Sequence, residues 1–150
     1  MTGPSPCPPL MLSIGLRGCV LAGLRYGPAL EFPPMKPSTI FLRRDVADVQ
    51  PWSETCGQIR PLLEEKDGAA AEVHHLQITN AKLHHHERTD EIYYVLDGQG
   101  RMRLDDEEIE LRKDVVVYVP RGVKHKAWGN LTVLVVCIPR GVLNDVHELE

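Results

Sequence analysis

The 150-residue sequence lacks the features that mark several large classes of protein. It has no apolar run of about 20 residues, the length that a helix needs to span a bilayer, so we expect no membrane segment. It also has no block of Lys or Arg, and 21 acidic residues outnumber 17 basic ones. Nucleic acid is therefore not expected as a partner.

Cysteine is scarce, and its positions form no recognisable pattern. Cys7, Cys19, Cys56 and Cys137 include no Cys-x-x-Cys pair, so we expect neither a disulfide framework nor a cysteine zinc site. The cytoplasm is then the expected compartment. Cys137 lies in an apolar segment and is interpreted as a small buried residue.

The composition changes at about residue 35. Residues 1–34 hold seven of the twelve prolines and none of the seven histidines. The apolar run Leu10–Leu24 imitates a signal peptide, but no Lys or Arg precedes it and Arg17 interrupts it. We expect residues 1–34 to be a disordered or mis-assigned extension, with Met35 as the true start and residues 35–150 as a single domain.

From Met35 onward the pattern is that of β-structure, because short segments rich in β-branched and aromatic residues alternate with turn residues. Asp97–Gly100 is interpreted as a hairpin turn. Little helix is expected beyond a turn or two at Val46–Trp52 or in the last few residues. The series predicts an all-β sandwich or barrel. The expected strands are Thr39–Arg44, Gly57–Leu63, Glu72–Thr79, Glu91–Leu96, Arg101–Leu104, Ile109–Leu111, Val115–Val119, Lys124–Trp128 and Thr132–Ile138.

The most informative stretch begins at His84. His84 and His86 are two residues apart, and residues i and i+2 of a strand face the same side, so their imidazoles converge. Glu91 follows five residues later, and a short bend would bring its carboxylate to the same point. Two imidazoles and a carboxylate suit Zn, Mn, Fe, Ni or Cu, and they leave coordination positions open for a reactant. The stretch therefore predicts a metal site.

A second motif, Pro120-x-Gly122-x-x-His125, follows downstream. Together the two motifs resemble the signature motifs of the cupin superfamily: His-x-His, four residues, Glu, six residues, Gly; then Pro-x-Gly, two residues, His. The resemblance covers roughly residues 57–140. It implies a small single-domain cupin, whose barrel is an antiparallel double-stranded β-helix of jelly-roll topology. The metal ligands that it implies are His84, His86, Glu91 and His125.

Three positions depart from the cupin pattern. Asp114 stands where the second motif begins with Gly, and Ile78 stands where a Gly precedes the first motif. Asn130 lies one residue further from His125 than the pattern requires. These positions shape turns rather than bind metal, so they leave the ligand set intact and put only the local turn geometry in question.

Strand parity suggests further site residues. If Glu91 faces the interior, Tyr93 shares its face and could bond a substrate oxygen, although a core tyrosine is the plainer interpretation. Glu91 is also a candidate base, which makes Glu91 and Tyr93 the candidate catalytic residues. One of His74 and His75 must face inward and could line the pocket.

Other residues near the motifs are given lesser roles. His85 should face away from the metal, and Glu87 is the rival carboxylate to Glu91. Arg60 is considered as a contact for an anionic substrate. Ala127 shares the face of His125 and keeps space open beside the metal. Trp128 faces outward, where it would mark a subunit interface or pack against the N-terminal segment.

Two functions remain open. The first is an enzyme that acts on a small organic molecule, since similar cupins include dioxygenases, isomerases, lyases and polyketide-modifying proteins. The second is a non-catalytic cupin that binds a metal or a small molecule as a sensor. A purely structural zinc site is a further possibility. The resemblance also implies a homodimer, and nothing in the sequence selects the metal among Fe, Mn, Zn, Ni and Cu.

Overall fold

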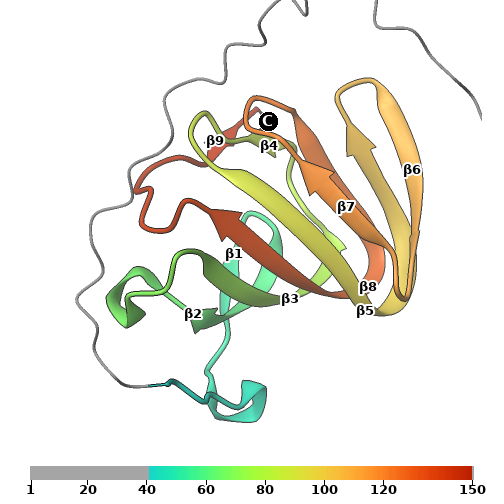
Figure 1. The fold of residues 1–150 in the computed structure, drawn as a ribbon. Coiled ribbons are helices and arrows are strands. Elements are labelled where there is room, and N and C mark those ends of the chain that lie inside the picture. Colours follow the sequence, from blue (N-terminus) through green and yellow to red (C-terminus); the bar gives the residue numbers. More distant parts are fainter. Residues whose placement is uncertain (1–40, 150) are drawn as a thin grey trace, which may run out of the picture. The chain divides into compact units, whose positions relative to one another are not determined.

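The computed structural model describes residues 41–149, and these are almost entirely β-structure (Figure 1). The expectations for residues 1–34 and for a start at Met35 lie outside the described residues. Two short 3₁₀ turns, η1 (Val46–Asp48) and η2 (Glu65–Asp67), are the helical elements of the described part. Asp45 caps η1, because its side chain accepts a hydrogen bond from the backbone N–H of Ala47.

The described residues form nine strands in one antiparallel sheet that curls into a barrel (Figure 1). Strand β8 is central, since it pairs with β3, β4 and β5, while β5 also pairs with β6 and β7. The all-β, jelly-roll fold expected from the sequence is confirmed. The strands are β1 (Trp52–Glu54), β2 (Gly57–Leu63), β3 (Glu72–Asn80), β4 (His84–His85), β5 (Asp90–Leu104), β6 (Glu107–Arg112), β7 (Val116–Val119), β8 (His125–Ile138) and β9 (His147–Glu148).

The prediction of a hairpin turn at Asp97–Gly100 is wrong. Strand β5 continues through these residues and pairs with β8 along its whole length, with one irregularity between Val95 and Asp97. Gly98 has a φ of +88°, and a methyl group at this position would overlap the carbonyl oxygen of Asn130. The glycines therefore permit a close approach of two paired backbones rather than a turn.

Three other expected strands also differ from the structure. Lys124–Trp128 and Thr132–Ile138 are parts of one strand, β8, which passes through Gly129 at a φ of +129°. The described part of the expected strand Thr39–Arg44, residues 41–44, is not a strand. By contrast, β2 has the bounds that the sequence predicts.

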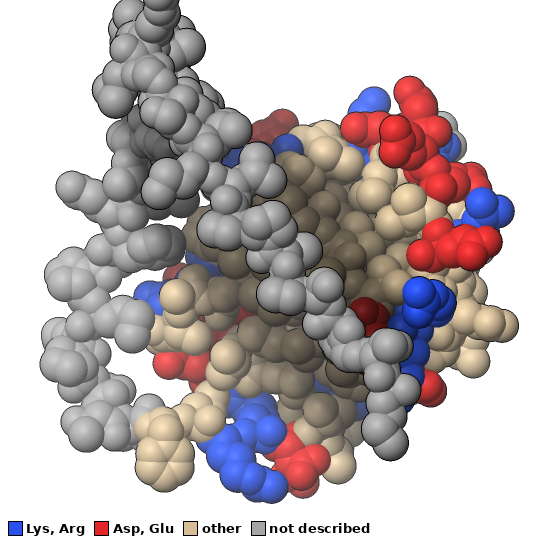
Figure 2. Space-filling model, turned by 45° about the vertical axis from the view of Figure 1, so that its right-hand side comes forward, with Lys and Arg blue, Asp and Glu red and all other residues tan. Residues whose placement is uncertain are grey.

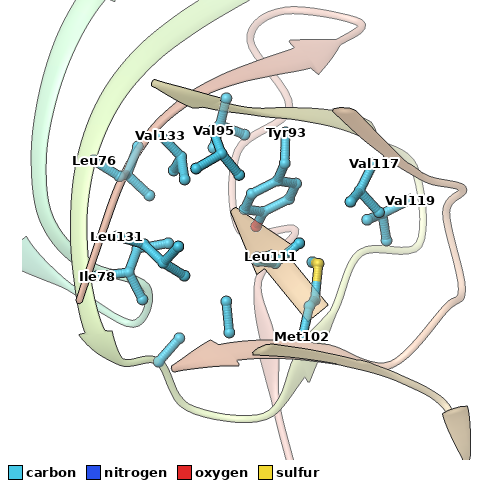
Figure 3. Close-up of a cluster of buried hydrophobic side chains, with 13 residues drawn as sticks. Leu76, Ile78, Tyr93, Val95, Met102, Leu111, Val117, Val119, Leu131 and Val133 are labelled. Carbon is cyan, nitrogen blue, oxygen red and sulfur yellow. The ribbon is translucent and has the colours of Figure 1, made fainter. Parts of the chain in front are cut away.

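The core lies inside the barrel, and alternate residues of β3, β5, β7 and β8 build most of it (Figure 3). Along β5, Glu91, Tyr93 and Val95 are 5%, 2% and 0% exposed, so the strand parity assumed for Glu91 holds. Leu76 and Leu131 enter from β3 and β8 on one side of the barrel (Figure 3). This packing fixes which side chains of β5 face the interior.

Asp114, which replaces the Gly of the cupin pattern, adopts the backbone conformation that a Gly would favour. Its φ is +68°, in the left-handed region that Asp tolerates better than most residues. The hydroxyl of Tyr94 donates a hydrogen bond to its carboxylate at 2.9 Å. The turn that leads into β7 is therefore kept without glycine.

Within residues 41–149, no helix is long and apolar enough to cross a membrane. On the face that Figure 2 shows, basic and acidic side chains are interspersed around a largely uncharged centre. This agrees with the mixed charges of the sequence, which has a net charge of −4.

Candidate metal centre

The four predicted ligands come together inside the barrel. His84 of β4 lies directly opposite His125 of β8, Glu91 comes from β5, and His86 follows β4. One ligand atom of each residue lies within 4.8 Å of the others, and all four side chains are buried. The two motifs therefore meet at one point, although their role as metal ligands stays a prediction.

Local backbone geometry places the second motif against the first. Pro120 to Val123 form a tight turn in which Val123 N–H donates to Pro120 O, with Gly122 at a φ of +87° in the third position. This is the arrangement of a type II turn, which requires a positive φ there. The N–H of Gly122 donates to the carbonyl of His86 at 2.6 Å, so the turn is tied directly to a candidate ligand.

The imidazole orientations fit a divalent transition metal. The Nδ1 atoms of His84 and His125 lie 2.9 and 3.0 Å from the carbonyls of Lys82 and Val123, so each Nδ1–H donates and each Nε2 keeps a free lone pair. The buried Nε2 atoms of His86 and His125 have no aligned hydrogen-bond partner. Imidazole nitrogens beside a carboxylate suit such ions.

Burial and charges in the cluster favour the metal-binding forms of Glu91 and His84. Although burial lowers the pKa of His86, the nearby carboxylates of Glu91 and Asp145 outweigh that effect, and the pKa is instead raised. Burial by itself would raise the pKa of Glu91, but its interactions with His125 and His86 lower that pKa well below the ordinary value. Its Oε2 atom lies 2.9 Å from Nε2 of His125 and 3.5 Å from Nε2 of His86. Burial and the neighbouring His125 lower the pKa of His84 to about 4, so His84 is a neutral imidazole near pH 7.

Tyr93 lies beside the candidate ligand Glu91. Its hydroxyl donates a hydrogen bond to Oε2 of Glu91 at 3.1 Å, and its side chain is 2% exposed. Burial, with the charge of Glu91, raises the pKa of Tyr93 well above its usual value, so the hydroxyl stays protonated. Its contribution here is to hold Glu91 in place, and the catalytic roles expected for both residues stay predictions.

The cluster opens into a pocket of about 260 Å³. Ile59, Leu76, Val135 and Val142 give it an apolar wall. Among the residues that the structure describes, its lining includes no Lys or Arg. The lining has four carboxylates, from Glu54, Glu72, Glu91 and Asp145.

His74 is the inward-facing member of the His74–His75 pair. It lines the pocket, and its Nε2 atom lies 3.4 Å from Oε2 of Glu72. His75 and Arg60 instead line a separate surface depression together with Asp45. Arg60, considered as a contact for an anionic substrate, is therefore outside the pocket that contains the ligand cluster.

The side chains around the cluster follow the expected strand faces. His85 faces away from the cluster and stacks on His147, with ring centroids 5.0 Å apart. Glu87, the rival carboxylate, is exposed, whereas Ala127 is buried beside His125. Trp128 faces outward, and the ammonium of Lys126 lies 5.5 Å from its ring centroid.

Two cysteines that the sequence did not connect with the site lie next to it. The Sγ atom of Cys56 is 3.5 Å from Nε2 of His84, and that of Cys137 is 3.7 Å from Oε1 of Glu91. Burial, with the charge of Glu91, raises the pKa of both thiols well above the ordinary value, so both are protonated near neutral pH. Cys137 lies directly opposite Glu91 in the β5–β8 register, which only a correct strand pairing could have predicted.

Comparison with known proteins finds sequence matches to the central part of the chain. A family model described as Cupin domain matches residues 74–139. An uncharacterized protein of Methanocaldococcus jannaschii, MJ1618, is 40% identical over 57 residues. That match covers 37% of this chain and 46% of the relative, so the chain spans less than half of the curated relative it matches.

Solved structures extend the similarity to most of the chain. A protein from Planctomyces limnophilus has a TM-score of 0.69 at 24% identity, over 73% of this chain and 97% of that one. The Streptomyces nucleoside dehydratase Pac13 has a TM-score of 0.64 at 15% identity, over 74% and 92%. The polyketide cyclase RemF from Streptomyces resistomycificus has a TM-score of 0.61 at 23% identity, over 74% and 87%. The solved structures show the same fold over most of the chain, and the family match at residues 74–139 identifies a small domain of the cupin superfamily there.

Proposed function

We propose that this protein is a metal-dependent enzyme that acts on a small organic molecule without an anionic group. The observation that carries the proposal is the convergence of His84, His86, Glu91 and His125 within 4.8 Å, where the first three line a pocket. The buried Nε2 atoms of His86 and His125 lack aligned hydrogen-bond partners. A bound divalent metal would supply Lewis-acid or dioxygen chemistry. Fe, Mn, Zn, Ni and Cu all suit this donor set.

The charge of the pocket supports the proposed substrate class. Proteins bind phosphate and carboxylate groups chiefly with Arg and Lys, and the described lining of this pocket has neither. Glu54 and Glu72 would instead repel an anion at its wall. The two protonated thiols add no charge of their own. An uncharged or cationic molecule with an apolar part fits this lining best.

The chain itself would contribute positioning and proton transfer. The anionic carboxylate of Glu91 is held by Tyr93 and would serve as both a ligand and a base. His74, paired with Glu72 in the same pocket, is a second group that could hold a proton beside the substrate. The apolar wall would limit the access of water to the reacting groups.

Two of the similar structures are consistent with an uncharged substrate. Pac13 is described as a nucleoside dehydratase and has been solved with uridine, and RemF is described as a polyketide cyclase. At 15% and 23% identity they establish the fold alone, so the reaction of this protein is inferred from its own pocket. The homodimer and the cytoplasmic location expected from the sequence stay predictions.

Substrate pairs that differ only in an anionic group would test this proposal. Two such pairs are uridine with uridine 5′-monophosphate and catechol with 3,4-dihydroxybenzoate. In each pair we expect metal-loaded protein to convert the uncharged member at least ~10-fold faster than the anionic one, since the pocket offers no Arg or Lys. Product formation would be followed by mass spectrometry and oxygen uptake by electrode, with chelator-treated protein as the control. Conversion that survives metal removal, or a preference for the anionic members, would contradict the proposal. Tight binding of metal and ligand without turnover would favour the sensor alternative.

A further inference from the structure

We propose that Asp145 is a positioning residue for the metal centre, whose carboxylate holds His86 in its ligating orientation. The inference rests on the proposed metal centre and adds a residue that neither cupin motif contains. Asp145 lies beyond residues 74–139, the segment that matches the Cupin domain family. It belongs to the C-terminal segment, residues 139–149, which supplies four residues to the pocket lining: Pro139, Val142, Asp145 and Val146.

The carboxylate of Asp145 is held by the three residues that follow His86. It accepts hydrogen bonds from the backbone N–H of Glu87 at 3.1 Å, from the backbone N–H of Arg88 at 3.2 Å and from the hydroxyl of Thr89 at 2.6 Å. The Nε atom of Arg88 adds a longer contact of 3.4 Å. Asp145 is 3% exposed, so it is a buried charge with a full set of donors. Such a residue fixes the backbone immediately after His86.

The same carboxylate faces the imidazole of His86. Its Oδ2 atom lies 3.9 Å from Nδ1 of His86, while Oε2 of Glu91 lies 3.5 Å from Nε2 on the other side of the ring. A distance of 3.9 Å is too long for a hydrogen bond, so the effect is that of a nearby charge. With a metal ion between Nε2 and the carboxylate of Glu91, the negative charge of Asp145 would favour the proton on Nδ1 and so keep the Nε2 lone pair on the metal.

Comparison with the other two histidines shows why His86 needs the carboxylate of Asp145. Nδ1 of His84 and Nδ1 of His125 each lie within hydrogen-bond distance of a carbonyl two residues earlier in the chain. For His86 the group beside Nδ1 comes from the distant Asp145 instead. Carboxylates or carbonyls beside a ligating imidazole commonly set its orientation and its affinity for metal.

The C-terminal segment is docked in a way that brings Asp145 to this place. Strand β9 pairs with β4, so that Glu148 lies opposite His84 (Figure 1). Glu148 also forms an ion pair with Lys82 at 2.7 Å and accepts a hydrogen bond from Thr55 at 2.6 Å. The segment that carries Asp145 is therefore attached to the same short strand that carries a candidate ligand.

The test uses Asp145→Asn, which keeps the size of the side chain and removes its charge. We expect the Kd for Co²⁺, measured by competition with a chelator, to rise by about 10- to 100-fold, and the visible spectrum of the Co²⁺ protein to change. Glu148→Gln is the matched control, because it weakens the docking of the same segment without touching His86. It should bind Co²⁺ within about 3-fold of the wild type, a difference of under 1 kcal/mol.

The outcomes separate this inference from the proposed metal centre. Wild-type protein that binds no Co²⁺ would contradict the metal centre itself. If the wild type binds Co²⁺ and Asp145→Asn has the same Kd and spectrum, the role of Asp145 is overturned while the metal centre stands. If Glu148→Gln loses as much Co²⁺ affinity as Asp145→Asn, the effect comes from the docking of the segment, which also overturns the role of Asp145. If metal-free Asp145→Asn does not fold, Thr89→Val keeps the charge but removes the 2.6 Å hydrogen bond that holds Oδ2, the oxygen beside His86, in its position, so we again expect the Kd to rise. A Kd for Thr89→Val equal to that of the wild type would then overturn the inference.

Discussion

Replacing His125 with Ala is expected to weaken transition-metal binding by at least ~100-fold, because second-sphere changes alone cost 10- to 100-fold and this change removes a ligand. His125 is the one candidate ligand from the second motif, and its Nε2 atom lies 2.9 Å from Oε2 of Glu91, closer than Nε2 of His86. Without it the carboxylate of Glu91 would lose a main partner in a buried site. Metal affinity would be measured by competition with a chelator, on protein first stripped of metal.

His85→Ala is the matched control for this experiment. His85 lies between two candidate ligands in the sequence but faces away from the cluster and stacks on His147. Its removal should leave the metal Kd within about 3-fold of the wild type, a difference of under 1 kcal/mol. If His85→Ala and His125→Ala lost metal equally, binding would reflect a histidine-rich surface rather than the buried cluster.

Gly98→Ala is expected to lower the free energy of unfolding by at least ~3 kcal/mol, which is a large effect for a single methyl group. Gly98 closes the first motif and lies where the paired strands β5 and β8 approach closely. Its φ is +88°, and a Cβ atom would overlap the backbone carbonyl oxygen of Asn130. Backbone atoms in a paired sheet cannot move aside as a flexible side chain can, so the two strands would have to separate locally. Urea denaturation would measure the loss.

Gly122→Ala provides the comparison that isolates the steric overlap. Gly122 has nearly the same φ, +87°, but no atom outside its immediate neighbours lies within 4 Å of the Cβ position. The substitution should therefore cost only the backbone strain of about 1–2 kcal/mol. Equal losses in the two variants would mean that the conformation, rather than the close approach to β8, explains the requirement for Gly98.

The ligand cluster was predictable because local spacing determines most of it. His84 and His86 are separated by the period of a strand, and the turn at Pro120–Gly122 needs only local residue types. Strand parity also predicts correctly that Tyr93 and Ala127 face the interior. Each of these expectations depends on the residues within a few positions of the motif.

The long strands were not predictable in the same way. Asp97-Gly98-Gln99-Gly100 has the composition of a hairpin turn, but the neighbouring strand β8 keeps the chain extended there. The glycines serve a close approach between residues that are about thirty positions apart in the sequence. Local composition does not distinguish these two uses of glycine.

The residues that surround the cluster needed the tertiary structure for a similar reason. Cys56 and Asp145 reach the site from a turn before β2 and from the C-terminal segment, far in sequence from the motifs. Cys137 enters through the pairing of β8 with β5. Their positions depend on strand register, and a shift by one residue would turn each strand side chain to the opposite face.

The central claim is that the four buried side chains bind a transition metal. Elemental analysis of untagged protein, produced without added metal or chelator, tests it most directly beside a His86→Ala variant. We predict Fe, Mn, Zn, Ni or Cu in near-stoichiometric amount in the wild type and a large drop in the variant. Wild-type protein that contains no metal, and that takes up none when these ions are added, would contradict the claim.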